Sequence, residues 1–271
     1  GWQYAGGQTE EGLFKGASNL EDLRRRLQTI MFQPSAEELN RQTPKLTRIA
    51  VPVDVPLTEY REVARNVKDA ILALSPKSKG YWTNVLDKMN LLRQAIGRAK
   101  VGQAVEWATD FLDTNLDNVK LLLYAHHLPV VQEVVRALEK YGILWTDGSV
   151  SPRERHERAV RFQAGKEERV MIITQAGSMG EDMFGLNGNE INNIAFLELE
   201  WRPMDFTQPE GRLDREGQTL PVNSWMFFAR GTIDDDLVDV RETKDDVIQD
   251  VIGGEDVPTV VQELIRKWRQ E

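Results

Sequence analysis

The chain lacks several features that would place it in a class at once. It has 271 residues and no cysteine, which excludes disulfide bonds and thiolate metal sites. No apolar run approaches the ~20 residues that are needed to cross a bilayer. The first residues also lack the basic segment followed by an apolar one that marks a signal peptide. We therefore expect an intracellular, cytoplasmic protein without a membrane partner.

Basic residues are outnumbered by acidic ones. Lys and Arg number 34 against 43 Asp and Glu, which gives a formal net charge of −9. A protein that coats nucleic acid needs positive charge to bind phosphates, so this balance argues against that class. Arginines still cluster locally, at residues 24–26 and at Arg153, Arg155, Arg158 and Arg161. Each cluster is either a basic strip for phosphates or an ordinary solvated helix face.

The hydrophobic pattern divides the chain into regions. With 41% hydrophobic residues the composition is that of a soluble globular protein. The regions are a connecting segment with one helix and one strand, a helical insertion, an α/β lobe and a charged helical tail, at residues 1–56, 57–118, 119–235 and 236–271. The first helix and strand are expected near residues 20–31 and 48–55. In the insertion, apolar residues lie on one helical face, at Val85, Met89, Leu92, Ile96 and Ala99.

From Val119 onward, short apolar runs alternate with helical patterns. The expected strands are residues 121–125, 143–145, 170–174, 194–199 and 224–229. Between two of them, residues 151–154 form a capping box with proline at the first helical position, which predicts a helix start. Strands without polar alternation, separated by helices, predict a parallel sheet buried on both faces. Ligands of such sheets bind beyond the carboxyl ends of the strands, in loops that start here near His126, Asp147, Thr174, Glu200 and Gly231.

The strongest functional signal is the segment from Gln208 to Gln218, QPEGRLDREGQ. Arg212 and Arg215 are three residues apart, so we expect them on one helix face. Planar guanidinium groups placed in this way can bind phosphate oxygens bidentately. Gly211 removes a side chain where a ligand approaches closely. The alternative is a surface helix with ordinary charges.

This segment resembles motif VI of superfamily-two helicases, in the form found in Swi/Snf-type DNA-dependent ATPases. Further segments resemble other motifs of that family in its order: residues 120–127 (motif IV), Asp147-Gly148-Ser149 with Arg155, residues 174–180 (motif V), Glu200-Trp201-Arg202-Pro203 and Gly231-Thr232-Ile233-Asp234. Leu92, Arg93, Gln94 and Lys100 of the insertion also fit. The resemblance covers roughly residues 18–250. It implies the second, RecA-like lobe of a helicase or translocase, an α/β fold whose mostly parallel sheet is flanked by helices.

The resemblance also implies roles for single residues. Arg215 would be the arginine finger that reaches the γ-phosphate of ATP, with Arg212 as its partner. The expected nucleotide-binding residues are Gln208, Gly180 and Gly211. The expected nucleic-acid-binding residues are Thr174, Gly177, His126, Ser149, Arg155 and Trp201. Asp214 stands where the family usually has His, and such departures favour a bacterial or phage relative.

Two motifs that this family uses to hold ATP and Mg²⁺ are missing. The only Gly-Lys pair, Gly165-Lys166, is followed by Glu167, so no G-x-x-x-x-G-K-[ST] loop occurs. No Asp-Glu dipeptide occurs either. In the family both motifs belong to the N-terminal lobe, so we expect ATP and Mg²⁺ to be held there and this chain alone to be inactive.

Several alternatives stay open. The chain could be a free-standing, non-catalytic module that binds nucleic acid or protein, although such a module has no need of arginine fingers. Duplex DNA is expected as the partner, and RNA is disfavoured by the helical insertion. Trp201 could stack on a base or be partly buried in the core. A metal site is not expected, because His126 and His127 are adjacent and point in different directions.

Overall fold

The computed structural model describes residues 46–175, 183–201, 204–215, 217–235, 237 and 257–270. All the helices and strands within these ranges belong to one compact unit, formed by residues 43–241 and 255–271. The helix expected at residues 20–31 lies outside the described residues, as do Gly177 and Gly180 of motif V. None of the described helices is long and apolar enough to span a membrane.

A six-stranded sheet forms the centre of this unit. Its strands are β1 (Leu46–Val53), β2 (Val119–Tyr124), β3 (Leu144–Thr146), β4 (Val170–Ile173), β5 (Glu190–Phe196) and β6 (Val222–Ala229). They lie in the order β1-β6-β5-β2-β4-β3, and every pairing is parallel. All residues of β2 and β4 are buried, as the uninterrupted apolar runs predicted. The expected α/β fold with a parallel sheet is confirmed.

The strand expected near residues 48–55 forms an edge of this sheet. β1 pairs with β6 along its whole length, from Leu46 opposite Val222 to Val53 opposite Ala229. The sequence pattern located the strand but placed it in a connecting segment, because pairing between such distant residues leaves no local signal. The division of the chain at residues 56, 118 and 235 stays a prediction.

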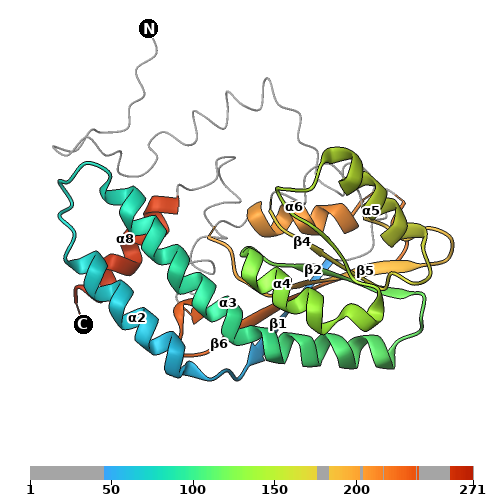
Figure 1. The fold of residues 1–271 in the computed structure, drawn as a ribbon, viewed down its shortest axis with the longest axis horizontal. Coiled ribbons are helices and arrows are strands. Elements are labelled where there is room, and N and C mark those ends of the chain that lie inside the picture. Colours follow the sequence, from blue (N-terminus) through green and yellow to red (C-terminus); the bar gives the residue numbers. More distant parts are fainter. Residues whose placement is uncertain are drawn as a thin grey trace, which may run out of the picture. The chain divides into compact units, whose positions relative to one another are not determined.

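Helices cover both faces of the sheet. They are α2 (Leu57–Leu72), α3 (Tyr81–Thr114), α4 (Leu128–Ala137), α5 (Pro152–Ala164), α6 (Met204–Leu213) and α8 (Val257–Trp268). α3 and α4 lie on one face of the sheet, and α5 and α6 lie on the other (Figure 1). Parallel strands lead to this arrangement, because each connecting helix must carry the chain from the carboxyl end of one strand back to the amino end of the next.

The helix boundaries follow the signals in the sequence. α5 begins at Pro152, and the side chain of Ser151 accepts a hydrogen bond of 3.2 Å from the backbone N–H of Glu154. In α3 the apolar face predicted from the sequence is turned inward: Val85, Met89, Leu92 and Ile96 are buried.

Two lysines are fully buried, which the sequence pattern did not reveal. Lys100 of α3 donates to Oδ2 of Asp234 at 2.8 Å and to the carbonyl of Phe227 at 3.1 Å. The same carboxylate oxygen accepts the backbone N–H of Ala229 at 3.0 Å. Asp234 thus joins α3 to the end of β6, which gives the Gly-Thr-Ile-Asp segment a structural role.

The second buried lysine, Lys120, lies at the start of β2. Its ammonium donates to the carbonyls of Phe162 and Gly165, at 2.5 and 2.6 Å, and so caps the last turn of α5. Burial lowers the pKa of Lys120 to about 8. Burial by itself disfavours the charged form, and the two carbonyls supply the compensating hydrogen bonds.

Removing the carboxylate of Asp234 should destabilise the chain strongly. Asp234→Ala leaves the Lys100 ammonium buried without a counter-charge, which costs about 3–5 kcal/mol. The free energy of unfolding, measured in urea, should fall by this amount. A Lys100→Met/Asp234→Leu double variant has no buried charge and should regain most of the loss. If Asp234→Ala unfolds at the same urea concentration as the unsubstituted chain, the ion pair does not hold α3 to β6.

Candidate functional site

Four of the predicted nucleic-acid-binding residues follow the ends of neighbouring strands. His126, Ser149, Thr174 and Trp201 come after β2, β3, β4 and β5. Because all strands are parallel, their carboxyl ends meet at one edge of the sheet, which we call the carboxyl edge. Backbone hydrogen bonds hold the loops together there: the N–H of Thr174 donates to the carbonyl of Thr146 at 3.1 Å. The structure therefore brings these residues to a common edge, as the sequence predicted.

A buried ion pair lies behind the carboxyl edge. Arg93 of α3 donates from Nη2 to Oε2 of Glu200 at 2.9 Å and to the carbonyl of Leu199 at 2.8 Å. Both charged side chains are almost fully buried, at 3% and 2% exposure. The guanidinium of Arg93 also lies over the ring of Trp201, 5.1 Å from its centroid. One helical side chain thus positions a carboxylate and an indole.

Glu200 connects this pair to His126. Its Oε1 accepts the hydroxyl of Tyr124 at 2.9 Å and lies 2.7 Å from Nδ1 of His126. Burial by itself raises the pKa of Glu200, but the guanidinium of Arg93 and the hydrogen bonds from His126 and Tyr124 outweigh it and lower the pKa to about 2. Glu200 is therefore ionised, and it fixes the orientation of the His126 ring.

A second carboxylate, Glu198, supports the same loop. Its Oε2 accepts the backbone N–H groups of His126 and His127 at 2.8 and 2.9 Å, and its Oε1 lies 2.5 Å from Nδ1 of His127. Burial acts to raise the pKa of Glu198, yet the hydrogen bonds from His127 lower it. Gly97 of α3 makes room for this carboxylate, because a Cβ there would lie 2.5 Å from Glu198 Oε1.

These carboxylates were not identified as site residues from the sequence. The sequence did contain one signal of their burial. Glu198 and Glu200 alternate with leucines directly after an apolar strand, and a carboxylate in such a position is buried unless the strand ends before it. The two adjacent histidines have their partners here, because each ring is bonded to one of these carboxylates. The network ties the loop after β2 to two carboxylates beyond β5.

The Asp147-Gly148-Ser149 segment forms a turn after β3. Oδ1 of Asp147 accepts the backbone N–H of Ser149 at 2.7 Å and its hydroxyl at 2.5 Å. The hydrogen bond from this hydroxyl is the main cause that lowers the pKa of Asp147. Arg155, at the start of α5, donates to the carbonyl of Val150 at 3.2 Å. Hydrogen bonds thus tie both Ser149 and Arg155 to residues of this turn.

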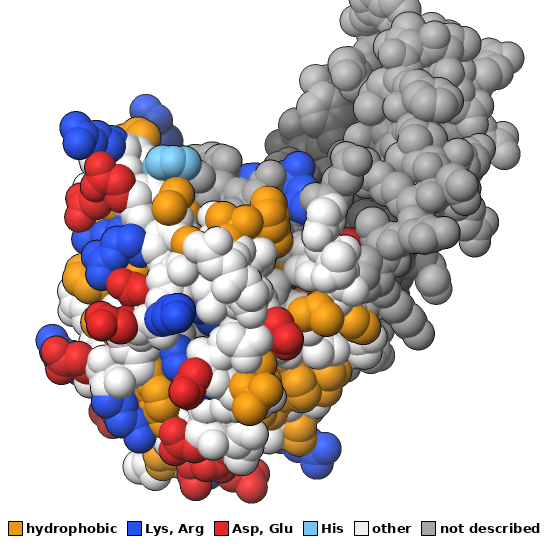
Figure 2. Space-filling model, turned by 90° about the vertical axis from the view of Figure 1, so that its right-hand side faces the viewer, with side chains coloured by type: hydrophobic (Ala, Val, Ile, Leu, Met, Phe, Trp, Pro, Cys, Tyr) orange, Lys and Arg blue, Asp and Glu red, His pale blue; other side chains and the backbone are white. Residues whose placement is uncertain are grey.

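The arginine cluster of α5 is largely neutralised by acids. Ion pairs join Arg153 to Glu157 at 2.9 Å, Arg158 to Glu154 at 2.6 Å and Arg161 to Glu168 at 2.6 Å. α5 lies on the side of the molecule that Figure 2 turns toward the viewer, where Lys and Arg side chains are interspersed with Asp and Glu. Of the two interpretations of this cluster, the geometry favours the solvated helix face.

The loop after β4 is tied to the start of α6. Thr174 is buried at the strand end, and Nε2 of Gln175 donates to Oδ1 of Asp205 at 2.9 Å. α6 carries the first part of the motif VI segment. Gln208 is exposed, whereas Glu210 is buried and forms a bidentate pair with Arg48 of β1, at 3.0 and 2.8 Å.

The two motif VI arginines do not share one helix face, which corrects the expectation from their spacing. Arg212 lies in the last turn of α6, but the helix ends at Leu213 and Arg215 lies beyond it. Two side chains cap the final carbonyls: Nε of Arg215 donates to Gly211 at 2.8 Å, and Nε2 of Gln218 donates to Leu213 at 3.3 Å.

The space beside Gly211 is open. A Cβ built on Gly211 would meet no heavy atom within 4 Å, so packing within the described part of the lobe does not require glycine there. This is consistent with close approach of a group from outside the chain. Gly211, Arg212 and Arg215 therefore lie at or just beyond the end of α6, whereas Gln208 lies in the middle of the helix.

The structure separates the two predicted sites. Gln218, just after the arginines, donates to the carbonyl of Ile191 at 2.9 Å, and Ile191 lies at the amino end of β5. The arginines thus lie toward the amino ends of the strands, whereas His126, Thr174 and Trp201 lie at the carboxyl edge. The predicted phosphate-binding and nucleic-acid-binding groups occupy opposite ends of α6.

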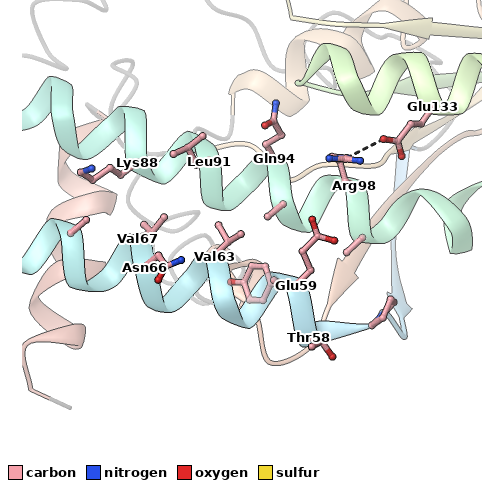
Figure 3. Close-up of a pocket in the computed structure, with 15 residues that line it drawn as sticks. Thr58, Glu59, Val63, Asn66, Val67, Lys88, Leu91, Gln94, Arg98 and Glu133 are labelled. Carbon is pink, nitrogen blue, oxygen red and sulfur yellow. Dashed lines mark hydrogen bonds and ion pairs between the residues drawn. The ribbon is translucent and has the colours of Figure 1, made fainter.

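A groove of about 760 Å³ lies between α2 and α3 (Figure 3). Val63, Val67 and Leu91 give it an apolar wall, and Arg98 at its end already pairs with Glu133 at 3.0 Å. None of the residues predicted to bind nucleotide or nucleic acid lines this groove.

Comparison with known proteins gives a consistent result. A family model described as the helicase conserved C-terminal domain matches residues 103–217. DNA annealing helicase and endonuclease ZRANB3 of Homo sapiens is 30% identical over 223 residues, which are 81% of this chain and 20% of that protein. SWI/SNF-related matrix-associated actin-dependent regulator of chromatin subfamily A-like protein 1 of Xenopus tropicalis is 28% identical over 243 residues, which are 88% of this chain and 24% of that protein. The chain spans about a fifth to a quarter of these curated relatives.

Solved structures show the same fold. The Sulfolobus solfataricus SWI2/SNF2 ATPase core domain aligns with a TM-score of 0.64 and 17% identity, over 92% of this chain and 54% of that chain. At this identity the likeness establishes the fold, and it confirms the RecA-like arrangement expected from the sequence.

Glu200 should make the stability of the chain depend on pH. Its pKa is about 2 in the folded chain against an ordinary value of 4.5. Its contribution is therefore complete above about pH 4.5 and is lost as the pH falls toward 2, and it amounts to about 3 kcal/mol. The difference in unfolding free energy between the unsubstituted chain and Glu200→Gln should narrow as the pH falls from 6 to 3, in urea titrations.

A matched control for this prediction is Glu157→Gln, which changes an exposed carboxylate of α5 and should have a small effect at both pH values. The contrary result is a difference in unfolding free energy between the unsubstituted chain and Glu200→Gln that stays constant from pH 6 to pH 3. That result would show that the buried carboxylate does not have a lowered pKa.

Proposed function

This chain belongs to the helicase conserved C-terminal domain family, in its Swi/Snf type, and on that premise we propose that it is the second motor lobe of a DNA-dependent ATPase that moves along duplex DNA. The observation that carries the proposal is the end of α6, where Arg212 and Arg215 lie beside the open space at Gly211. The name of ZRANB3, a DNA annealing helicase, supports DNA as the polymer.

In this proposal ATP is bound between two lobes. Mg²⁺ and most phosphate contacts would come from the other lobe of the full protein, because this sequence contains neither the phosphate-binding loop nor the Asp-Glu pair that the family uses to hold them. The ion would neutralise charge on the phosphates. Arg215 would approach the γ-phosphate when the lobes close, and an arginine in this role contributes roughly 10³–10⁵ in rate.

The pairing of Glu210 with Arg48 supports this role. Glu210 lies in α6 two residues before Arg212, and its bidentate bond to Arg48 ties it to β1. A carboxylate held in this way fixes α6 to β1, the strand at the edge of the sheet. The arginines at the end of the helix can then be presented to a phosphate in a fixed orientation.

Duplex DNA would contact the carboxyl edge. We assign backbone contacts to His126, Ser149 and Arg155, together with Gly177 of motif V, whereas Thr174, which is buried at the end of β4, would position the loop that follows this strand. The half-buried indole of Trp201, held by Arg93 on one side, would pack against a base or sugar. The separation of this edge from the arginines allows DNA and ATP to be bound at the same time, so that lobe closure couples the two.

The isolated 271-residue chain should not hydrolyse ATP. It has neither the phosphate-binding loop nor the carboxylate pair for Mg²⁺. Phosphate release should equal that of a protein-free control in the presence of Mg²⁺ and duplex DNA. Turnover that survives repurification and disappears in Arg215→Ala would contradict the assignment of the ATP site to another lobe.

In the full-length protein, Arg215→Ala should lower kcat by about 10³ or more. Duplex affinity should change little, because DNA is bound at the carboxyl edge. Arg215→Lys should restore little activity, since an ammonium lacks the planar fork. Arg153→Ala, which removes an exposed arginine of α5, is the control and should leave kcat unchanged. An Arg215→Ala protein that melts early yet turns over at the parental rate would reduce Arg215 to a structural residue.

A further inference from the structure

A row of basic side chains runs along α2. Arg61, Arg65 and Lys68 are spaced by four and three residues, so they lie on one face of the helix. Arg61 and Arg65 are exposed, and neither forms an ion pair within the described part of the chain. The row extends over about 10 Å, since each residue of a helix rises about 1.5 Å.

The row faces a hollow that α8 completes. This hollow, of about 440 Å³, is lined by the three basic residues of α2, by Lys267 and Trp268 of α8 and by the loop of residues 231–235 after β6. α8 is anchored by buried apolar side chains, at Val261, Leu264 and Ile265. Residues almost two hundred positions apart thus place four cationic side chains around one space.

The carboxylates close to this hollow are already engaged. Asp234 pairs with Lys100 at 2.8 Å. Asp235, the one acid among the described residues of the lining, accepts the backbone N–H of Gly231 at 2.6 Å. On α2, Glu62 and Asp69 each follow a basic residue by one position, which rotates them by about 100° away from the row. Arg153, Arg158 and Arg161 of α5 differ from Arg61 and Arg65, because ion pairs with glutamates offset their charge.

We propose that this hollow, the α2–α8 basic hollow, binds the phosphate backbone of duplex DNA as a contact surface separate from the loops after β2 to β5. The proposal rests on the proposed function, since it takes the same DNA as ligand. The loop after β6 lies at the carboxyl edge, and β6 is the neighbour of β5. A duplex that contacts Trp201 after β5 can therefore continue along the same edge to the hollow.

The shape of the basic row favours a polymer over a small phosphate ligand. A small anion requires donors that converge on one point, whereas these cations are spread along a helix. Duplex DNA carries one charge per about 1.7 Å of its axis, so about 10 Å of duplex presents about six phosphates. The surface binds through charge and without base contacts, so its binding is independent of DNA sequence.

The test compares two double variants of the chain that lose the same charge. Arg61→Ala/Arg65→Ala removes two cations of the hollow. Lys140→Ala/Lys166→Ala removes two exposed lysines before β3 and β4, at the opposite edge of the sheet. Duplex affinity is measured by fluorescence anisotropy from 50 to 200 mM salt. The first variant should bind at least fivefold more weakly at low salt. The slope of the logarithm of the association constant against log salt should become less negative by about 1–2.

The control variant should stay within about twofold of the unsubstituted chain, and both variants should keep its melting temperature because the substituted residues are exposed. Equal losses in the two variants, or no loss in Arg61→Ala/Arg65→Ala, would overturn the proposal. A Trp201→Ala variant separates the two hypotheses: if it alone loses affinity, the DNA-binding edge stands and the hollow does not. If the unsubstituted chain binds no duplex at low salt, both fail.

Discussion

Two buried cations of α3, seven residues apart, determine how this helix lies on the sheet. Arg93 pairs with Glu200 beyond β5 and Lys100 pairs with Asp234 beyond β6, at 2.9 and 2.8 Å. β5 and β6 are adjacent strands. A buried ion pair adds little net stability over an apolar pair, but a buried charge that loses its partner costs several kcal/mol. Any shift of α3 along its axis breaks both pairs, so the helix has one favourable register, and His126 and Trp201 depend on it.

Net charge is a poor guide to where this chain can bind a polyanion. The total of −9 would exclude a nucleic-acid-binding surface if the charge were spread evenly. In the structure, glutamates offset the charge of three arginines of α5, whereas basic residues of α2 and α8 lie around a common hollow. The local field decides binding and steering, and it falls off within about one Debye length, 8 Å at physiological salt. An acidic protein can therefore carry a confined cationic surface.

The elements of this fold that depend on local sequence could be predicted, and those that depend on distant partners could not. Apolar runs located β2 and β4, and Ser151 with Pro152 located the start of α5. The pairing of β1 with β6 and the contacts of Arg93 had no local signal, because a charged residue within a helical pattern is normally solvated. The end of α6 was also missed, since the Gln218 side chain that caps it lies beyond the helix. The pattern of apolar strands, by contrast, predicted which loops gather at the carboxyl edge, because parallel strands all end there. The positions of Gly177 and Gly180 stay predictions.

The place of β1 at the sheet edge has a practical consequence for dissecting the protein. The helicase family match, residues 103–217, contains β2 to β5 but neither β1 nor β6. A fragment cut at those boundaries would leave β5 with a free edge of unpaired backbone N–H and C=O groups, which is a template for pairing with another chain. A fragment that begins at residue 57 would lack β1 and would therefore leave β6 with the unpaired edge. The smallest autonomous piece must therefore include the strand that precedes the helical insertion, even though that strand lies far from the family match in the sequence.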